Sequence, residues 1–293
     1  IMFKGSAVAL VTPFNDNGVD FESLENLIKF HIDNQTDAIV VCGTTGEATT
    51  MTEEEYFSTI KFVVEKVNKK IPVIAGSGSN NTMRSVYLSK ECEKLGVDGL
   101  LVVNPYYNKC NKKGLKLHFE TIASSVNIPI ILYNVPSRTN VNIDPQTVFE
   151  LSKIKNIVGI KEASGDLAQV AHIKSLVDED FYIYSGNDDS ITPLLSVGGH
   201  GVISVVANVL PKETHDLVMS YLNGDIETSK KLQLELKPLI DSLFIEVNPI
   251  PVKTALNLMG LNAGKLRLPL TDMEDKNIEI LKKELLDRGI KLC

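Results

Sequence analysis

Lys161 is the residue in this sequence best suited to covalent chemistry. It directly follows the apolar run 157–160, in which polar residues are missing. If its side chain faces an apolar interior, desolvation disfavours the ammonium ion and exposes a nucleophilic amine. Such an amine forms a Schiff base with a carbonyl compound. A lysine at a strand end more commonly extends its charge to water, so the surrounding pattern must favour the nucleophile.

Tyr133 and Glu162 are the polar residues expected next to Lys161. Tyr133 ends the preceding apolar run, so it can lie beside Lys161 and transfer protons during imine formation. A tyrosine packed in the core or at its rim fits the same pattern. Glu162 should point to the opposite side of the strand by alternation, which indicates a structural role.

The segment 43–46 and Arg138 could each bind a carboxylate. Glycines flank Thr44 and Thr45, so a turn here could offer backbone N–H groups and two hydroxyls to an anion. A strand-to-helix turn that needs its glycines for geometry alone has the same sequence. Arg138 offers two parallel donors to a second carboxylate, although an arginine in a loop is commonly solvated.

Short apolar runs precede all these residues and must position them. The runs are rich in Val, Ile or Leu and apolar throughout, as in strands that are buried on both faces. They occupy residues 7–11, 38–41, 72–75, 99–103, 129–132, 157–160, 181–184 and 201–205. Amphipathic stretches of helical period lie between them. Thr52 and Glu55 form a capping-box pattern at the start of the stretch 53–67.

The spacing of the runs predicts the fold class. They start about every 28 residues, which is the size of one βα unit. Eight such units predict an α/β protein with a closed (β/α)8 TIM barrel, whereas an open doubly wound sheet usually has fewer strands. We expect the barrel over 2–223, with the catalytic site at the carboxyl ends of its strands. Residues 224–293 are expected to form a small C-terminal helical appendage.

Composition excludes several classes of function. The 293 residues carry 30 Lys and Arg against 37 Asp and Glu, for a net charge of −7, without a basic stripe. Nucleic-acid binding is therefore not expected. No run approaches the roughly 18 apolar residues of a membrane span, and the N-terminal apolar run is too short for a signal peptide. The four cysteines lack paired spacing, which predicts a reducing, cytoplasmic location.

Cofactor motifs are missing from the sequence as well. Gly76 and Gly78 lack the third glycine of a dinucleotide fingerprint, and there is no P-loop. The five histidines show no metal-ligand spacing. The segment 187–189 could ligate a hard cation, but a helix N-cap explains it more simply. We therefore expect neither a metal nor another cofactor.

The chain resembles the dihydrodipicolinate synthase (4-hydroxy-tetrahydrodipicolinate synthase) family from end to end. That family belongs to the pyruvate-dependent class I aldolases, which also include N-acetylneuraminate lyase. The resemblance rests on motifs in a fixed order: GTTGE (43–47), NPYYN (104–108), YNVPSRT (133–139), GIKEA (159–163), GGHGVIS (198–204) and NPIPVK (248–253). Each motif is weak alone, but together they are specific.

The resemblance implies condensation of pyruvate with L-aspartate 4-semialdehyde in a homotetramer, a dimer of dimers. Lys161 would form the imine with pyruvate. Arg138 would bind the carboxylate of the aldehyde. Tyr133, Thr45 and Tyr107 of a neighbouring subunit would form a proton relay. Thr44 and Thr45 would bind the carboxylate of pyruvate, and Gly186 and Ile203 would offer backbone contacts.

Three alternative functions share part of this pattern. A sialic-acid or keto-deoxy sugar-acid lyase shares the imine chemistry but must bind several sugar hydroxyls. A non-catalytic ligand-binding relative and a metal-dependent barrel enzyme are more distant alternatives. The resemblance also implies that members inhibited by lysine carry His and Glu where this chain has Tyr56 and Arg84, near Asn80 and Tyr106. We therefore expect weak or absent feedback inhibition by lysine.

Overall fold

Eight parallel strands close into a barrel in the computed structural model, which describes residues 2–293. The strands are β1 (Gly5–Ala9), β4 (Ala38–Val41), β5 (Val73–Gly76), β6 (Gly99–Val103), β7 (Ile130–Asn134), β8 (Ile157–Glu162), β9 (Tyr182–Ser185) and β10 (Gly201–Ser204). They follow one another around the barrel in chain order, and β10 closes the ring by pairing with β1. The predicted (β/α)8 barrel is thus confirmed.

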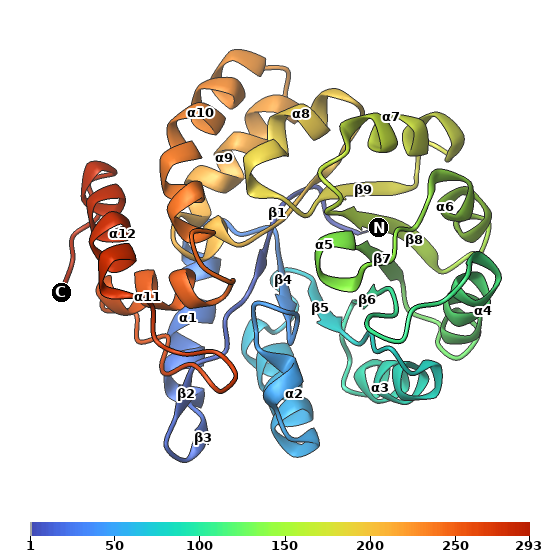
Figure 1. Ribbon diagram of the computed structural model, residues 1–293, viewed down its shortest axis with the longest axis horizontal. Helices are drawn as coiled ribbons and strands as arrows, with labels where there is room; N and C mark the ends of the chain where they lie inside the picture. The colour runs from blue at the N-terminus through green and yellow to red at the C-terminus, as the bar shows by residue number, and fades with distance from the viewer. Residues whose placement is uncertain (1) are drawn as a thin grey trace.

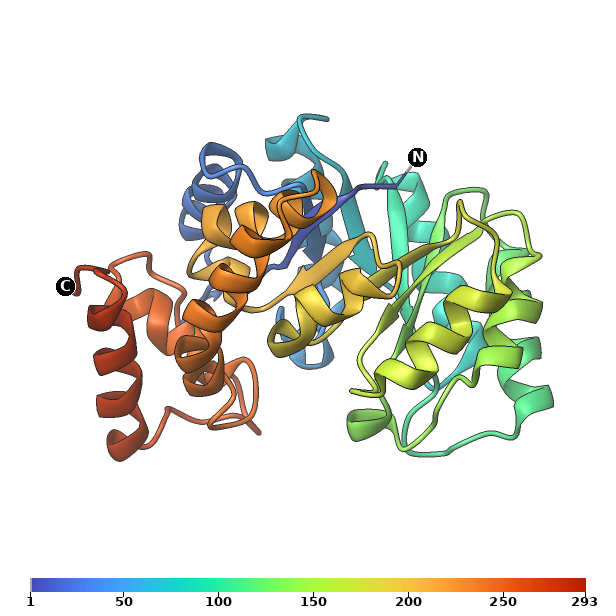
Figure 2. The same ribbon diagram turned by 90° about the horizontal axis from the view of Figure 1, so that it is seen from above.

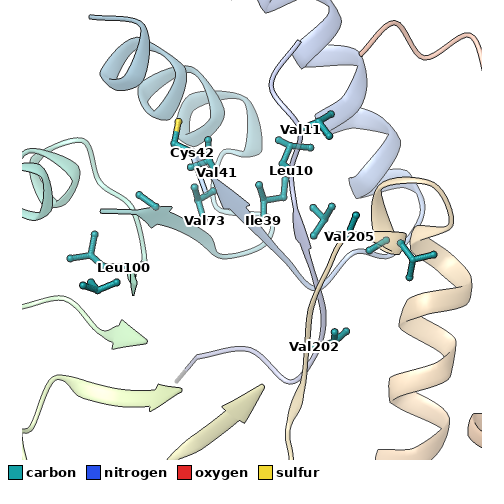
Figure 3. Packing of buried hydrophobic residues seen from close by; sticks show 14 of the residues in the cluster. Leu10, Val11, Ile39, Val41, Cys42, Val73, Leu100, Val202 and Val205 are labelled. Carbon is teal, nitrogen blue, oxygen red and sulfur yellow. The ribbon is translucent and has the colours of Figure 1, made fainter. Parts of the chain in front are cut away.

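Alternating side chains along each strand divide the apolar core into two layers. In β4, Ala38 and Val40 belong to the cluster inside the barrel, while Ile39 and Val41 belong to the layer beneath the helices. This is the alternation that the pleat of a strand imposes. Figure 3 shows the outer layer, with side chains from several strands directed toward the surrounding helices. Both faces are buried, which explains the continuous apolar runs.

Helices surround the barrel on its outside (Figure 1). They are α1 (Phe21–Asp33), α2 (Glu53–Val67), α3 (Thr82–Lys94), α4 (Lys112–Ala123), α5 (Pro136–Thr139), α6 (Pro145–Ser152), α7 (Leu167–Leu176), α8 (Ile191–Ser196), α9 (Pro211–Leu222), α10 (Ile226–Leu243), α11 (Ile250–Leu258) and α12 (Asp275–Asp287). The predicted capping box at the start of α2 is present: Thr52 and Glu55 bond each other's backbone N–H groups. Among residues 2–293, no helix is both long and apolar enough to cross a membrane.

The C-terminal helices leave the ring but remain attached to it. Figures 1 and 2 show α11 and α12 at one end of the molecule, outside the other helices. A short hairpin of β2 (Phe14–Asn15) and β3 (Gly18–Val19), which the sequence did not predict, meets this region where Phe14 pairs with Gly264. In α10, Gln233 donates a hydrogen bond to the carbonyl of Asp188 at 2.9 Å. The boundary at residue 223 stays a prediction.

Candidate active site

Lys161 and Tyr133 lie next to each other on adjacent strands. β7 and β8 pair in parallel with Tyr133 opposite Lys161, and the lysine Nζ is 4.4 Å from the centre of the tyrosine ring. Both residues are buried, with 6% and 8% of their surface exposed. β8 continues through Glu162, so Lys161 lies inside the strand rather than after it. The predicted neighbours are therefore confirmed, and the expected end of the strand was too early.

Burial tunes both groups for proton exchange. Desolvation lowers the pKa of Lys161 to about 8, while the negative charge of Asp188 raises it and the charge of Arg138 lowers it further. Burial raises the pKa of Tyr133, and Arg138 and Thr44 offset part of that rise. Near neutral pH the site therefore holds an amine that loses its proton readily beside a phenol that keeps its own.

The lowered pKa of Lys161 predicts a specific pH dependence. Imine formation needs the neutral amine, so kcat/KM for pyruvate should rise with pH and level off above about 8. Asp188→Asn removes a charge that raises the pKa of Lys161, and it should move this inflection to lower pH. A pH profile of kcat/KM for both proteins measures the shift. An inflection that stays in place or moves upward contradicts this coupling.

The segment 43–47 forms the predicted turn after β4. The N–H of Glu47 donates to the carbonyl of Thr44 at 3.0 Å and closes it. Thr44 is exposed to the cavity, whereas Thr45 is buried. The Thr45 hydroxyl oxygen accepts a hydrogen bond from Nδ2 of Asn248 at 2.9 Å. Both threonines therefore line the same cavity.

A cavity of about 590 Å³ brings six of the eight predicted site residues together. They are Thr44, Thr45, Tyr133, Arg138, Lys161 and Gly186. Arg138 reaches the cavity from α5, and its Nη2 donates to the carbonyl of Asn248 at 3.4 Å. A Cβ on Gly186 would lie 3.1 Å from Cε of Lys161 and 2.6 Å from Cβ of Ala163. Glycine is thus required for the close approach of this segment to the lysine.

Tyr107 and Ile203 are not among the cavity-lining residues in the part of the chain that the structure describes. Tyr107 lies in the loop after β6 with 91% of its surface exposed and a φ of 69°. Ile203 is buried in β10, within the apolar cluster inside the barrel. A contact through the neighbouring subunit for Tyr107 and a backbone contact for Ile203 both stay predictions.

Asp188 is a site residue that the sequence interpretation missed. We interpreted the segment 187–189 as a helix N-cap, but no side-chain cap is formed at that helix. Instead Oδ2 of Asp188 accepts the N–H groups of Val205 and Val206 at 3.0 and 2.8 Å. Its Oδ1 is buried with no hydrogen-bond partner among residues 2–293. The interpretation failed because the bonded backbone lies after the next strand rather than in the local helix.

The cavity wall also extends into the C-terminal region. Phe244 and Asn248 line it, although the sequence indicated a site within 2–223. Asn248 contacts both Thr45 and Arg138, so it joins two of the predicted binding residues. The NPIPVK motif was the available signal, but its residues carried no assigned role. Across residues 2–293 there is no cluster of three His, Cys, Asp or Glu side chains that could hold a metal ion.

An ion pair between Arg84 and Glu53 also lines the cavity. Nη1 of Arg84 is 2.6 Å from Oε2 of Glu53. Burial raises the pKa of Tyr56, and its hydroxyl donates to the carbonyl of Gly76 at 2.7 Å. The cation at position 84 is thus already paired. Weak feedback by lysine stays a prediction.

Fold and site together define the class of protein. A closed (β/α)8 barrel that buries a lysine beside a tyrosine at the carboxyl ends of its strands is the arrangement of a lyase of the class I aldolase kind.

Comparison with known proteins narrows this class to one family. A family model described as the Dihydrodipicolinate synthetase family matches residues 2–287. A 4-hydroxy-tetrahydrodipicolinate synthase of Caldicellulosiruptor bescii is 60% identical over 99% of both chains. The crystal structure of dihydrodipicolinate synthase from Aquifex aeolicus has 46% identity and a TM-score of 0.97 over 99% of both chains. The chloride-inhibited Acinetobacter baumannii enzyme, complexed with pyruvate, has 43% identity and a TM-score of 0.96 over 98% of this chain and 99% of that one. The chain belongs to the dihydrodipicolinate synthetase family.

Proposed function

We propose that this protein condenses pyruvate with L-aspartate 4-semialdehyde to give 4-hydroxy-tetrahydrodipicolinate, which opens the route to diaminopimelate and lysine. One observation carries the chemistry: Lys161 is buried beside Tyr133 and its pKa is lowered to about 8. The name of the relative that is 60% identical supports the reaction. The related structure described as complexed with pyruvate supports the first substrate.

In the proposed reaction the neutral Nζ of Lys161 attacks the keto carbon of pyruvate, and water leaves to give an imine. Loss of a methyl proton converts the imine to an enamine, which attacks the aldehyde carbon. The amino group of the second substrate then displaces Lys161 by transimination and closes the ring. Tyr133, Thr45 and Tyr107 of a neighbouring subunit would relay the protons. The amine itself activates the carbonyl, so the proposal includes no metal or redox cofactor.

Separate groups would bind the two carboxylates. The turn with Thr44 and Thr45 would hold the carboxylate of pyruvate, with backbone contacts from Gly186 and Ile203. Arg138 would hold the carboxylate of the aldehyde, because its guanidinium can bind a carboxylate through two parallel hydrogen bonds. Arg138 lines the cavity and is exposed, so it is open to a second substrate that arrives after the imine has formed.

Turnover assays test this function against its closest alternative. We expect product formation from pyruvate and L-aspartate 4-semialdehyde, and no cleavage of N-acetylneuraminate or a keto-deoxy sugar acid. Sugar-acid cleavage at a comparable kcat/KM would favour the sister lyase function instead. A protein that binds pyruvate without any turnover would favour the ligand-binding alternative.

Arg138→Leu is expected to act mainly on the second substrate. Loss of a charge-assisted carboxylate contact should raise KM for the aldehyde about tenfold or more. The imine with pyruvate should still form, because Lys161 and Tyr133 remain. Steady-state kinetics with each substrate varied in turn measures the effect. Lys153→Leu, which changes a surface cation paired with Asp178 at 3.0 Å, is the control. An unchanged KM for the aldehyde in Arg138→Leu would show that Arg138 does not bind the carboxylate of the aldehyde.

We further propose a homotetramer, a dimer of dimers, in the cytoplasm, with no nucleic-acid or membrane partner. A side chain that is 91% exposed, as that of Tyr107 is, is available to the active site of a neighbouring subunit. The four cysteines are free thiols, which is consistent with a reducing compartment.

A further inference from the structure

A buried ion pair joins the C-terminal region to the turn that carries Thr44 and Thr45. Nζ of Lys253, in α11, is 2.8 Å from Oε1 of Glu47, and each side chain is 1% exposed. Figures 1 and 2 show α11 outside the ring of helices, whereas β4, which leads into the turn, belongs to the barrel. The pair therefore connects two parts of the chain that are about 200 residues apart.

Both members of the pair have further hydrogen-bond partners. Nζ of Lys253 also donates to the carbonyls of Thr12 at 3.0 Å and Lys265 at 2.6 Å. The other carboxylate oxygen of Glu47 accepts the N–H of Arg267 at 3.1 Å. The ring of Phe14 lies 4.8 Å from the ammonium group. A hydrogen-bond network of this kind holds both side chains in one arrangement.

Stability alone does not explain why the chain buries these two charges. Removing two ions from water costs free energy that their attraction only partly returns, and apolar residues of similar size are often at least as stabilising. Glu47 also has a φ of 53°, a left-handed conformation that is unfavourable for a residue with a side chain. The buried charges and the left-handed backbone both oppose folding, so their presence indicates that Glu47 must be held in one position.

The pair positions the turn 43–47, which ends at Glu47. Three side chains hold this turn. Thr12 donates its hydroxyl hydrogen to the carbonyl of Gly46 at 2.8 Å, Asn248 donates to the hydroxyl of Thr45, and Lys253 holds Glu47. Two of these three contacts come from residues beyond 223. The turn is thus held largely by the C-terminal region.

We propose that Glu47 and Lys253 form a positioning pair that sets the geometry of the turn carrying Thr44 and Thr45, and thereby the affinity for the carboxylate of the first substrate. This rests on the proposed function, in which that substrate is pyruvate. Neither residue touches the reacting atoms. Their effect passes through the backbone of the turn, so it should appear in KM for pyruvate rather than in the identity of the nucleophile.

The test compares Glu47→Asp and the double variant Glu47→Gln/Lys253→Met with the wild type. Glu47→Asp keeps the buried charge but withdraws the carboxylate by one methylene group. The double variant removes both charges together and leaves no unpaired ion. Each should raise KM for pyruvate about tenfold. A displacement of about 1 Å in a positioned group can lower the rate of an enzyme reaction up to about 100-fold, so an effect of this size is expected. KM for the aldehyde and the site of borohydride trapping should stay unchanged.

The matched control is Glu150→Gln/Lys116→Met, which removes a surface ion pair of 2.9 Å and should leave every constant unchanged. Far-UV circular dichroism and thermal unfolding report whether each variant folds. If the double variant does not fold, the KM values of Glu47→Asp alone test the proposal. Folded variants with the wild-type KM for pyruvate, or with both KM values raised equally, overturn the proposal. A wild-type protein that forms no pyruvate adduct overturns the proposed function and this inference with it.

Discussion

Lys161→Ala is expected to lower kcat at least about 1,000-fold, because it removes the only proposed nucleophile and a covalent pathway has no substitute for it. The side chain is buried inside β8 next to Tyr133. No other lysine is among the cavity-lining residues that the structure describes. Steady-state turnover of pyruvate with L-aspartate 4-semialdehyde measures the loss.

Two further variants separate loss of the nucleophile from loss of charge or fold. Lys161→Arg keeps a cation but cannot form an imine under these conditions, because arginine stays protonated, so it should be as inactive as the alanine variant. Lys153→Ala removes a surface lysine and should keep full activity. Substantial turnover by Lys161→Arg would show that the charge, and not the amine, carries the reaction.

Tyr133→Phe is expected to lower kcat about 100-fold, within the range that positioned general acid–base groups contribute. Burial raises the pKa of this phenol, so it holds a proton where imine formation needs a donor. The pyruvate adduct should still form on Lys161, only more slowly. Rapid-quench measurement of adduct formation, together with kcat, records both effects.

Tyr182→Phe is the matched control. Tyr182 pairs with Gly159 near the start of β9, on the strand that follows β8, and its hydroxyl has no proposed role. Its kcat should equal that of the wild type. If Tyr133→Phe keeps the wild-type kcat and rate of adduct formation, the proton-transfer role must be assigned to another group.

Local patterns were sufficient to predict the barrel and the central pair of residues. Continuous apolar runs identified each barrel strand because both faces of such a strand are buried. Neighbouring parallel strands then placed Tyr133 beside Lys161 without any knowledge of long-range contacts. The start of β1 was placed at residue 7 instead of Gly5, because the strand begins with Gly5 and Ser6, which are not part of the apolar run. Its end was placed at residue 11 instead of Ala9, because the apolar run continues past the strand.

The features of the site that were missed depend on contacts between distant segments. Asp188 bonds the backbone after β10 rather than its own helix. Asn248 meets Thr45 across about 200 residues. Neither contact leaves a periodic signal in the sequence, because each depends on how loops from different βα units and the C-terminal region pack together. For the same reason, the sequence predicted the C-terminal helical appendage but not that Phe244 and Asn248 within it line the cavity.

Borohydride reduction in the presence of pyruvate tests the central claim most directly. Reduction converts an imine into a stable secondary amine, which mass spectrometry of the intact protein and of its peptides can locate. We predict one reduced pyruvate adduct per chain, located on Lys161 and missing from Lys161→Ala. An adduct on another lysine, or no adduct in a wild-type protein that turns over both substrates, would contradict a Schiff base at Lys161.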